Sequence, residues 1–256
     1  MTLFDSIILG IIEGITEFLP ISSTGHMILV SHFLNIPQSV TLTTFEIVVQ
    51  LGAILAVVVS YYKKLFDIEM IKKLTVAFIP TGIVGVIVFP YIKHLLGSPF
   101  IVASMLLLGG IAILIVEKNY KKHTHESEAT NVADISYKHA FILGCFQTLA
   151  IIPGVSRSGA VIIGGLTQKL SRKMLVEFSF LLAVPTMIIA TLYTLLKKHN
   201  ELGVDSISPI VVGTIVSFIV AFLVIRLALA YIRKHSFEIF GWYRIVIGVI
   251  LLIILW

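Results

Sequence analysis

The sequence predicts an all-α, polytopic membrane protein that contains two inverted repeats. First, the 256 residues are 57% hydrophobic and only 13% charged, with a mean hydropathy of +1.03, whereas a soluble domain carries roughly 25% charged residues. Second, six uninterrupted apolar runs each approach the ~20 residues that a helix needs to cross a bilayer. Third, two further apolar regions, one in each half of the chain, are interrupted by similar Pro, Ser and Gly motifs.

The remaining composition narrows the class of protein. The net charge of +5 does not indicate nucleic-acid binding, because the basic residues lie in short loops between apolar runs. The single cysteine, Cys145, excludes an intrachain disulfide and is expected to pack as a small apolar residue. No cleavable signal peptide is expected, since the first apolar run has no basic leader and continues directly into two glutamates.

The interrupted regions, 4–34 and 139–168, are each predicted to form two short helices that meet at a break, which is a re-entrant hairpin. Broken backbone at membrane depth is tolerated only where it is packed in protein or lines a wet cavity. The polar stretch 118–138, which includes His123, His125, Glu126, Glu128 and Asp134, is predicted to be a linker. The six spans are predicted at 43–62, 74–92, 99–117, 175–196, 209–231 and 239–256.

The two halves, 1–117 and 139–256, resemble each other. At an offset of 134 the matching pairs are Gly10 and Gly144, Glu13 and Gln147, Ser22 and Ser156, Thr24 and Ser158, and Gly25 and Gly159. Residues 46–51 also resemble residues 177–182. Because each half has one hairpin and an odd number of spans, the second half would be inserted upside down, with the broken segments meeting near mid-membrane.

The loop charges predict the orientation. Basic residues are concentrated on one side of the predicted layout, which carries thirteen, against three on the other. By the positive-inside rule the rich side is cytoplasmic, so both termini are predicted to face outward. The first hairpin would then enter from outside and the second from inside.

Two glutamates lie in the first hairpin. Glu13 and Glu17 are four residues apart and share one helix face. Two close carboxylates repel each other and would repel a phosphate, so a bound Mg²⁺ or Ca²⁺ that bridges them to phosphate oxygens is the expected resolution. The alternative is a pair that faces a water-filled vestibule and has a structural role.

The first break follows Pro20, which ends the preceding helix. The next helix would present unpaired N–H groups to an anion. Its expected phosphate-binding residues are Ser22, Thr24 and Gly25. His26 lies three residues after Ser23, so the two can project to one side and act in acid, base or nucleophilic catalysis.

The second break adds a permanent cation. Arg157 lies between Ser156 and Ser158, and its planar fork matches phosphate geometry, so these three residues are expected to bind substrate phosphate. The alternative partner of Arg157 is a carboxylate of Glu13, Glu17 or Glu46. Glu46 and Glu177 are interpreted either as site residues or as helix-start dipole partners. Arg226 and Arg244 are expected to extend toward the membrane surface or to pair structurally.

At these two motifs the sequence resembles the bacitracin-resistance type of undecaprenyl-pyrophosphate phosphatase. The motifs run from Glu13 to His26 and from Pro153 to Ser158, and the resemblance extends over essentially the whole chain. It implies hydrolysis of a C55 polyprenyl diphosphate to its monophosphate, divalent-metal dependence, bacitracin resistance, and a location in the bacterial cell membrane with a site that opens outward. The functional positions that it implies fall on Glu13, Glu17, Ser22, Ser23, His26, Ser156 and Arg157.

One departure from the family pattern is visible. The family often has a threonine shortly after the arginine motif, whereas this chain has Ala160, Val161 and Ile162. The hydroxyl of that threonine therefore has no counterpart at these three positions.

Two hypotheses compete at this point. An enzyme would use Arg157 and a metal to neutralise the diphosphate while Ser23, His26 or water attacks phosphorus, and Ser23 activated by His26 is the preferred nucleophile. A transporter would move a polyprenyl phosphate across the membrane with the same broken helices. Two acids beside Ser23 and His26 favour the enzyme, and the sequence is also compatible with a homodimer.

Overall fold

The computed structural model is all-helical over the residues that it describes, which are 1–92, 98–122, 131–198, 203, 206–232 and 234–255. Residues 123–130 of the predicted linker, including His123, His125, Glu126 and Glu128, lie outside the described residues. Asp134 of the predicted linker lies in the short 3-10 helix η2 (Val132–Asp134).

Six helical segments within the described residues are long and apolar enough to cross a membrane, as the sequence predicts. The first span consists of two helices, α3 (Val40–Val48) and α4 (Gln50–Leu65), which form one segment from Val40 to Leu65. The other spans are α5 (Ile68–Ile92), α6 (Pro99–Lys122), α9 (Arg172–Lys198), α10 (Ile207–Ile232) and α11 (Glu238–Leu255). The prediction of an all-α, multi-pass membrane protein is therefore confirmed.

The two interrupted regions form short helices on either side of a break. The first region contains α1 (Leu3–Thr16) and α2 (Ser23–Phe33). The second contains α7 (Tyr137–Gln147), the 3-10 helix η3 (Thr148–Ile151) and α8 (Arg157–Thr167). Thr2 caps α1 and Ser136 caps α7 by accepting a backbone N–H from the first helical turn.

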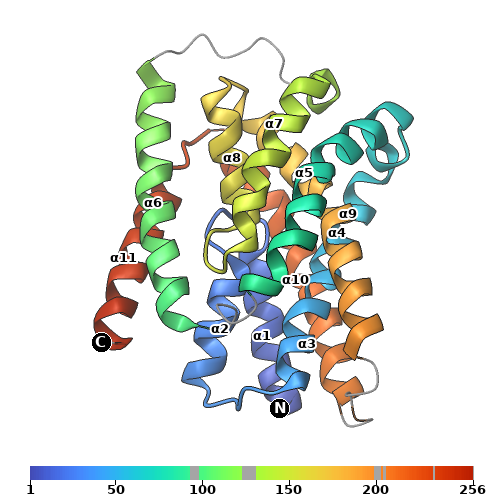
Figure 1. Cartoon of the computed structure of the whole chain (residues 1–256), viewed down its shortest axis with the longest axis vertical. Coiled ribbons are helices and arrows are strands. Elements are labelled where there is room, and N and C mark those ends of the chain that lie inside the picture. The colour runs from blue at the N-terminus through green and yellow to red at the C-terminus, as the bar shows by residue number, and fades with distance from the viewer. Residues whose placement is uncertain (93–97, 123–130, 199–202, 204–205, 233, 256) are drawn as a thin grey trace.

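The two hairpins lie in opposite halves of the molecule. In Figure 1, α1 and α2 lie in the same half as both chain termini, and α7 and α8 lie mainly in the half that contains the linker. Their breaks contact each other, since the Oγ of Ser158 donates to the backbone oxygen of Leu19 at 3.0 Å. This arrangement agrees with hairpins that enter from opposite sides, while the internal repeat itself stays a prediction.

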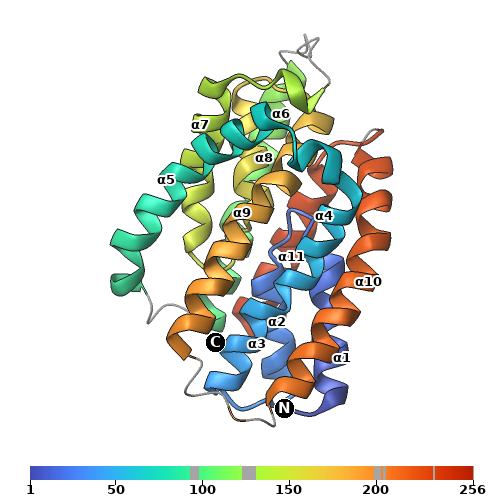
Figure 2. The same cartoon turned by 90° about the vertical axis from the view of Figure 1, so that its right-hand side faces the viewer.

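Close helix pairs surround the meeting point of the hairpins. The most extensive contacts pair α11 with α6 and α1 with α10, and Figure 2 shows α10 alongside α1 and α4. Small residues allow these approaches: a Cβ added at Gly10 of α1 would lie 2.6 Å from the backbone oxygen of Gly213 in α10. The largest apolar core forms around α9, which also packs against α8, the helix that follows the second break.

Candidate active site

Both breaks restart a helix with the same unusual backbone geometry. Ser22 and Ser156, the residues before α2 and α8, have positive φ values of 72° and 74°. Each serine Oγ accepts the N–H of the glycine three residues later, from Gly25 at 3.3 Å and Gly159 at 3.1 Å. Positive φ is uncommon outside glycine, so its recurrence shows that both helix N-termini are built in the same way.

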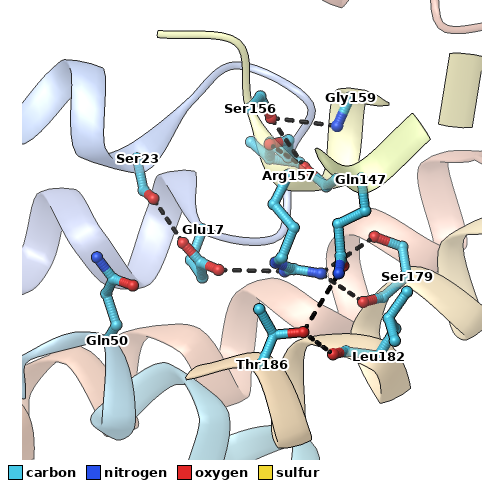
Figure 3. Close-up of polar contacts among 12 residues, drawn as sticks. Glu17, Ser23, Gln50, Gln147, Ser156, Arg157, Gly159, Ser179, Leu182 and Thr186 are labelled. Atoms are coloured by element: carbon cyan, nitrogen blue, oxygen red, sulfur yellow. Dashed lines mark hydrogen bonds and ion pairs between the residues drawn. The ribbon is translucent and has the colours of Figure 1, made fainter. Parts of the chain in front are cut away.

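The centre of the site is a buried chain of polar contacts between the two hairpins. Ser23 Oγ donates to Glu17 Oε2 at 2.5 Å, and Arg157 Nη2 donates to Glu17 Oε1 at 3.1 Å (Figure 3). Arg157 Nη1 donates to the backbone oxygen of Ser179 in α9 at 2.6 Å. Glu17 therefore joins a hydroxyl of the first hairpin to a cation of the second, and all three side chains are buried.

This geometry changes the expected roles in two ways. In the structure Arg157 pairs with the carboxylate of Glu17, which was the predicted alternative to a substrate phosphate. The predicted pairing of Ser23 with His26 is absent from the described contacts, and the acceptor of the Ser23 proton is Glu17 instead. Arg157 nevertheless keeps capacity for a ligand, because its buried Nε has no hydrogen-bond partner.

Glu13 lies one helical turn before Glu17, and the N–H of Glu17 donates to the backbone oxygen of Glu13 at 3.0 Å. The Glu13 side chain is fully buried, and neither carboxylate oxygen has a hydrogen-bond partner. A buried carboxylate without partners must bind a proton or a cation, because the desolvated charge is otherwise too costly. Its two hard oxygens fit the Mg²⁺ or Ca²⁺ that the sequence predicts.

Within the described residues, no three His, Cys, Asp or Glu side chains converge to hold a metal by themselves. Mg²⁺ is often bound through one or two carboxylates together with substrate phosphates. A site that consists of Glu13 with Glu17 therefore fits a cation that arrives with, or is completed by, a phosphate ligand.

His26 is fixed by contacts at both ring nitrogens. Nδ1 lies 2.7 Å from the backbone oxygen of Ser22, and Nε2 lies 2.8 Å from the hydroxyl of Tyr243 in α11. Because a carbonyl oxygen can only accept, Nδ1 must carry the hydrogen. In the neutral ring Nε2 is then the basic nitrogen, and the Tyr243 hydroxyl donates to it.

The serine hydroxyls predicted to bind phosphate have protein partners. Ser158 Oγ donates to the backbone oxygen of Leu19 and lies 3.1 Å from Ser156 Oγ, so Ser158 joins the two hairpins and Ser156 contacts it within the second. Thr24 lies in the first turn of α2 and is partly exposed. A phosphate-binding role for Ser22, Thr24, Gly25, Ser156 and Ser158 stays a prediction.

The other charged residues of the apolar segments differ in whether their side chains have partners. Glu177 forms an ion pair with Lys64 at 2.7 Å, which agrees with a structural role. Glu46 keeps one buried carboxylate oxygen without a partner. The guanidinium of Arg226 lies 4.8 Å from the centre of the Phe222 ring. Ala160, Val161 and Ile162, where the family pattern departs, are buried in the second hairpin.

Two contributors to the site were not predicted from the sequence: Ser179 positions Arg157, and Tyr243 contacts His26. Arg244, which was expected to extend toward the membrane surface or to pair structurally, is fully buried between the breaks. For Arg244 a signal existed, because an arginine inside an apolar span is costly and marks a functional hypothesis. A serine and a tyrosine in apolar helices carry no comparable signal.

The fold and the site define a class: an integral-membrane protein in which two broken helical hairpins bury a Ser–Glu–Arg chain beside an unpartnered carboxylate and two helix N-termini. This combination suits the displacement of a phosphoryl group more than passive binding, because a hydroxyl with its proton acceptor lies beside a cationic side chain and a helix N-terminus.

Comparison with known proteins identifies the family. Residues 6–250 match the family model described as "Bacitracin resistance protein BacA", and the chain belongs to this family. A protein of Sulfurihydrogenibium sp. (strain YO3AOP1) named "Undecaprenyl-diphosphatase" is 46% identical over 250 residues, which cover 98% of each chain. A protein of Methanococcus aeolicus with the same name is 49% identical over 253 residues, again 98% of each chain.

Proposed function

We propose that this protein hydrolyses undecaprenyl diphosphate to undecaprenyl phosphate and inorganic phosphate. The observation that carries the proposal is the hydrogen bond from Ser23 to Glu17, with Arg157 bound to the other oxygen of the same carboxylate. The full-length relatives named "Undecaprenyl-diphosphatase" support the substrate. Regeneration of the lipid phosphate would recycle the carrier of peptidoglycan synthesis and reduce the diphosphate that is available to bacitracin.

The first half of the reaction uses Ser23 as nucleophile. Its Oγ attacks the terminal phosphorus while its proton passes to Glu17 Oε2, and the bond from that phosphorus to the bridging oxygen breaks. Undecaprenyl phosphate leaves with the electron pair of that bond, and Ser23 carries the phosphoryl group.

The second half returns the serine. Water attacks the phosphoserine, the P–Oγ bond breaks, and inorganic phosphate leaves while Ser23 Oγ takes back the proton that it gave to Glu17. We assign the base that accepts the proton of this water to His26, because its Nε2 is the nitrogen that can accept a proton when Nδ1–H is held by Ser22. Glu17 and His26 are then the bases of different half-reactions.

Negative charge at phosphorus is offset by groups from both hairpins. The unpartnered Nε–H of Arg157 and the N-termini of α2 and α8 can donate to phosphate oxygens. Glu13, with Glu17, would hold a divalent cation, which when bound would neutralise diphosphate charge.

The competing function, transport of a polyprenyl phosphate without hydrolysis, is not favoured, because a carrier has no use for a serine bonded to a buried base. The test is release of inorganic phosphate from undecaprenyl diphosphate by purified protein in detergent, where no second compartment exists. Stoichiometric phosphate release supports the enzyme. Binding without release, at any metal concentration, would refute it.

We also propose that the protein lies in the bacterial cell membrane with both termini outside and the site open to the outer side. The loop charges support this, because the end of α6, which carries basic residues and leads into the linker, lies in the half of Figure 1 opposite to the half that contains both chain ends. In a Cys145→Ala background, an impermeant thiol reagent on intact cells should label a cysteine at Gln38 and not one at Lys63, both of which are exposed. The reverse labelling would invert the topology. The proposed homodimer can be measured separately as a mass in detergent.

A further inference from the structure

Arg244 is the largest side chain in the structure with no solvent exposure, and the proposed reaction does not use it. Among the described residues no carboxylate pairs with it. Instead all five N–H donors of its guanidinium point at backbone oxygens. These are Pro20 at 3.0 Å and Val155 at 2.9 Å from Nη1, Met105 at 3.0 Å and Gly154 at 2.9 Å from Nη2, and Leu106 at 3.3 Å from Nε.

The acceptors come from three separate parts of the chain. Pro20 belongs to the first break, Gly154 and Val155 belong to the second, and Met105 and Leu106 belong to α6. A break removes the N–H donors that a continuous helix would offer to its carbonyls. Arg244 supplies charge-assisted donors to both breaks at once, and it thereby fixes one against the other and both against α6.

The surroundings are shaped for a guanidinium. A Cβ added at Gly109 of α6 would lie 2.1 Å from Nη2 of Arg244, and its three nearest neighbours would all be atoms of that guanidinium. On the other side, a Cβ at Gly159 of α8 would lie 3.2 Å from Nη1. Lysine could not replace this arrangement, because a single ammonium has three donors on one atom and cannot reach five acceptors around a planar fork.

We propose that Arg244 is a positioning residue for phosphoryl transfer: it holds the two breaks in register so that Ser23 and Glu17 of one hairpin meet Arg157 of the other. This inference rests on the proposed function. Arg244 has no donor left for substrate, so its effect passes through the backbone of Pro20 and of Gly154 and Val155. A displacement of about 1 Å at a reacting group can cost about 10²-fold in rate, which sets the expected size of the effect.

The most specific variant keeps the arginine at position 244 and changes its neighbour. Gly109→Ala should push the guanidinium from its carbonyls and lower kcat about 10²-fold, while KM changes by less than about threefold. The matched control is Gly85→Ala in α5, where an added Cβ meets nothing within 4 Å, and it should behave as wild type. Thermal unfolding in detergent for each variant measures how much of the loss reflects unfolded protein.

A second variant tests the guanidinium itself. The kcat of Arg244→Ala should fall at least as much as that of Gly109→Ala. Added guanidinium ion at millimolar concentration should raise the kcat of Arg244→Ala at least tenfold. The same ion should not change Arg226→Ala or wild type. Arg244→Lys should remain as impaired as Arg244→Ala, because charge alone does not hold the breaks.

The outcomes separate the inference from the proposed function. If wild type releases no phosphate, the proposed function fails. If wild type is active but folded Gly109→Ala and Arg244→Lys keep wild-type kcat, or lose only affinity for substrate, the positioning role is refuted. Rescue of Arg244→Ala by an equal concentration of ammonium ion would also refute it, since that would show a role for charge alone.

Discussion

The proposed roles of Glu17, as the base for Ser23, and of His26, as the base for water, predict which step fails when each side chain is replaced. Glu17 is bonded to Ser23 at 2.5 Å, whereas His26 is bonded to Ser22 and Tyr243. We therefore expect His26→Ala to form the phosphoserine and to fail in its hydrolysis. Glu17→Gln, which keeps the shape but removes the base, should fail before any phosphoserine forms.

The magnitude follows from the size of base catalysis, which is typically about 10²–10⁴-fold for one step. If phosphorylation and hydrolysis are about equal in wild type, about half of the enzyme is phosphorylated at steady state. A loss of about 10²-fold in the second step alone raises this fraction to about 0.99, while turnover falls about 50-fold. In Glu17→Gln the fraction falls to about 0.01 for the same loss in the first step.

The assay uses undecaprenyl diphosphate labelled with ³²P in the terminal phosphate, quenched in acid and counted on the protein. A phosphoserine survives acid and is released by base. Ser23→Ala should carry no label, and His32→Ala, which removes an exposed histidine of the same helix, should behave as wild type. An acid-labile adduct would move the nucleophile to His26, and full labelling of Glu17→Gln would exclude Glu17 as the base.

Three further predictions concern the groups around this centre. Glu13→Gln should raise the concentration of free Mg²⁺ or Ca²⁺ needed for half-maximal activity at least tenfold, and chelator should abolish wild-type activity. The control is Glu69→Gln, at an exposed position. Full activity in excess chelator would remove the metal from the mechanism. Arg157→Lys should lose about 10²–10³-fold in kcat, nearly as much as Arg157→Ala, because one ammonium cannot replace donors on separate nitrogens to Glu17 and Ser179; a change in KM alone would make it only a binding residue. Tyr243→Phe should lower kcat by about 2–10-fold, the size of one hydrogen bond, whereas the exposed Tyr62→Phe should not, and unchanged activity would show that His26 needs no support from α11.

Much of the fold could be predicted because membrane insertion writes a strong signal into the chain. Six apolar runs predicted six spans, and Pro20 and Pro153 marked the two breaks to within a few residues. The span ends were less accurate: α6 continues to Lys122, beyond the predicted end at 117, because basic side chains at a helix end can reach toward the polar side of the membrane.

The composition of the site was more predictable than its pairings. Buried acids, hydroxyls and an arginine at broken helices pointed to one phosphate site from the sequence alone. Which of them touch depends on how the two hairpins dock, and sequence spacing contains no information on that. Ser23 and His26 are close in sequence, yet Ser23 contacts Glu17 and His26 contacts Tyr243, which lies 217 residues away.

The surroundings of the second hairpin explain why the two halves differ at the position of Glu13. Where the first hairpin has Glu13, the predicted repeat places Gln147 in the second, and its amide nitrogen lies 3.0 Å from Thr81 Oγ1 and 3.4 Å from Thr186 Oγ1. The Gln147 amide nitrogen has hydroxyl partners, and its unpartnered Oε1 carries no charge, whereas Glu13, with both oxygens unpartnered, requires a proton or a cation. The first hairpin therefore supplies the acids and the second supplies Arg157. Because the Glu17–Arg157 pair is buried, loss of either partner would leave an uncompensated charge that costs about 3–5 kcal/mol, so neither hairpin can form this site alone.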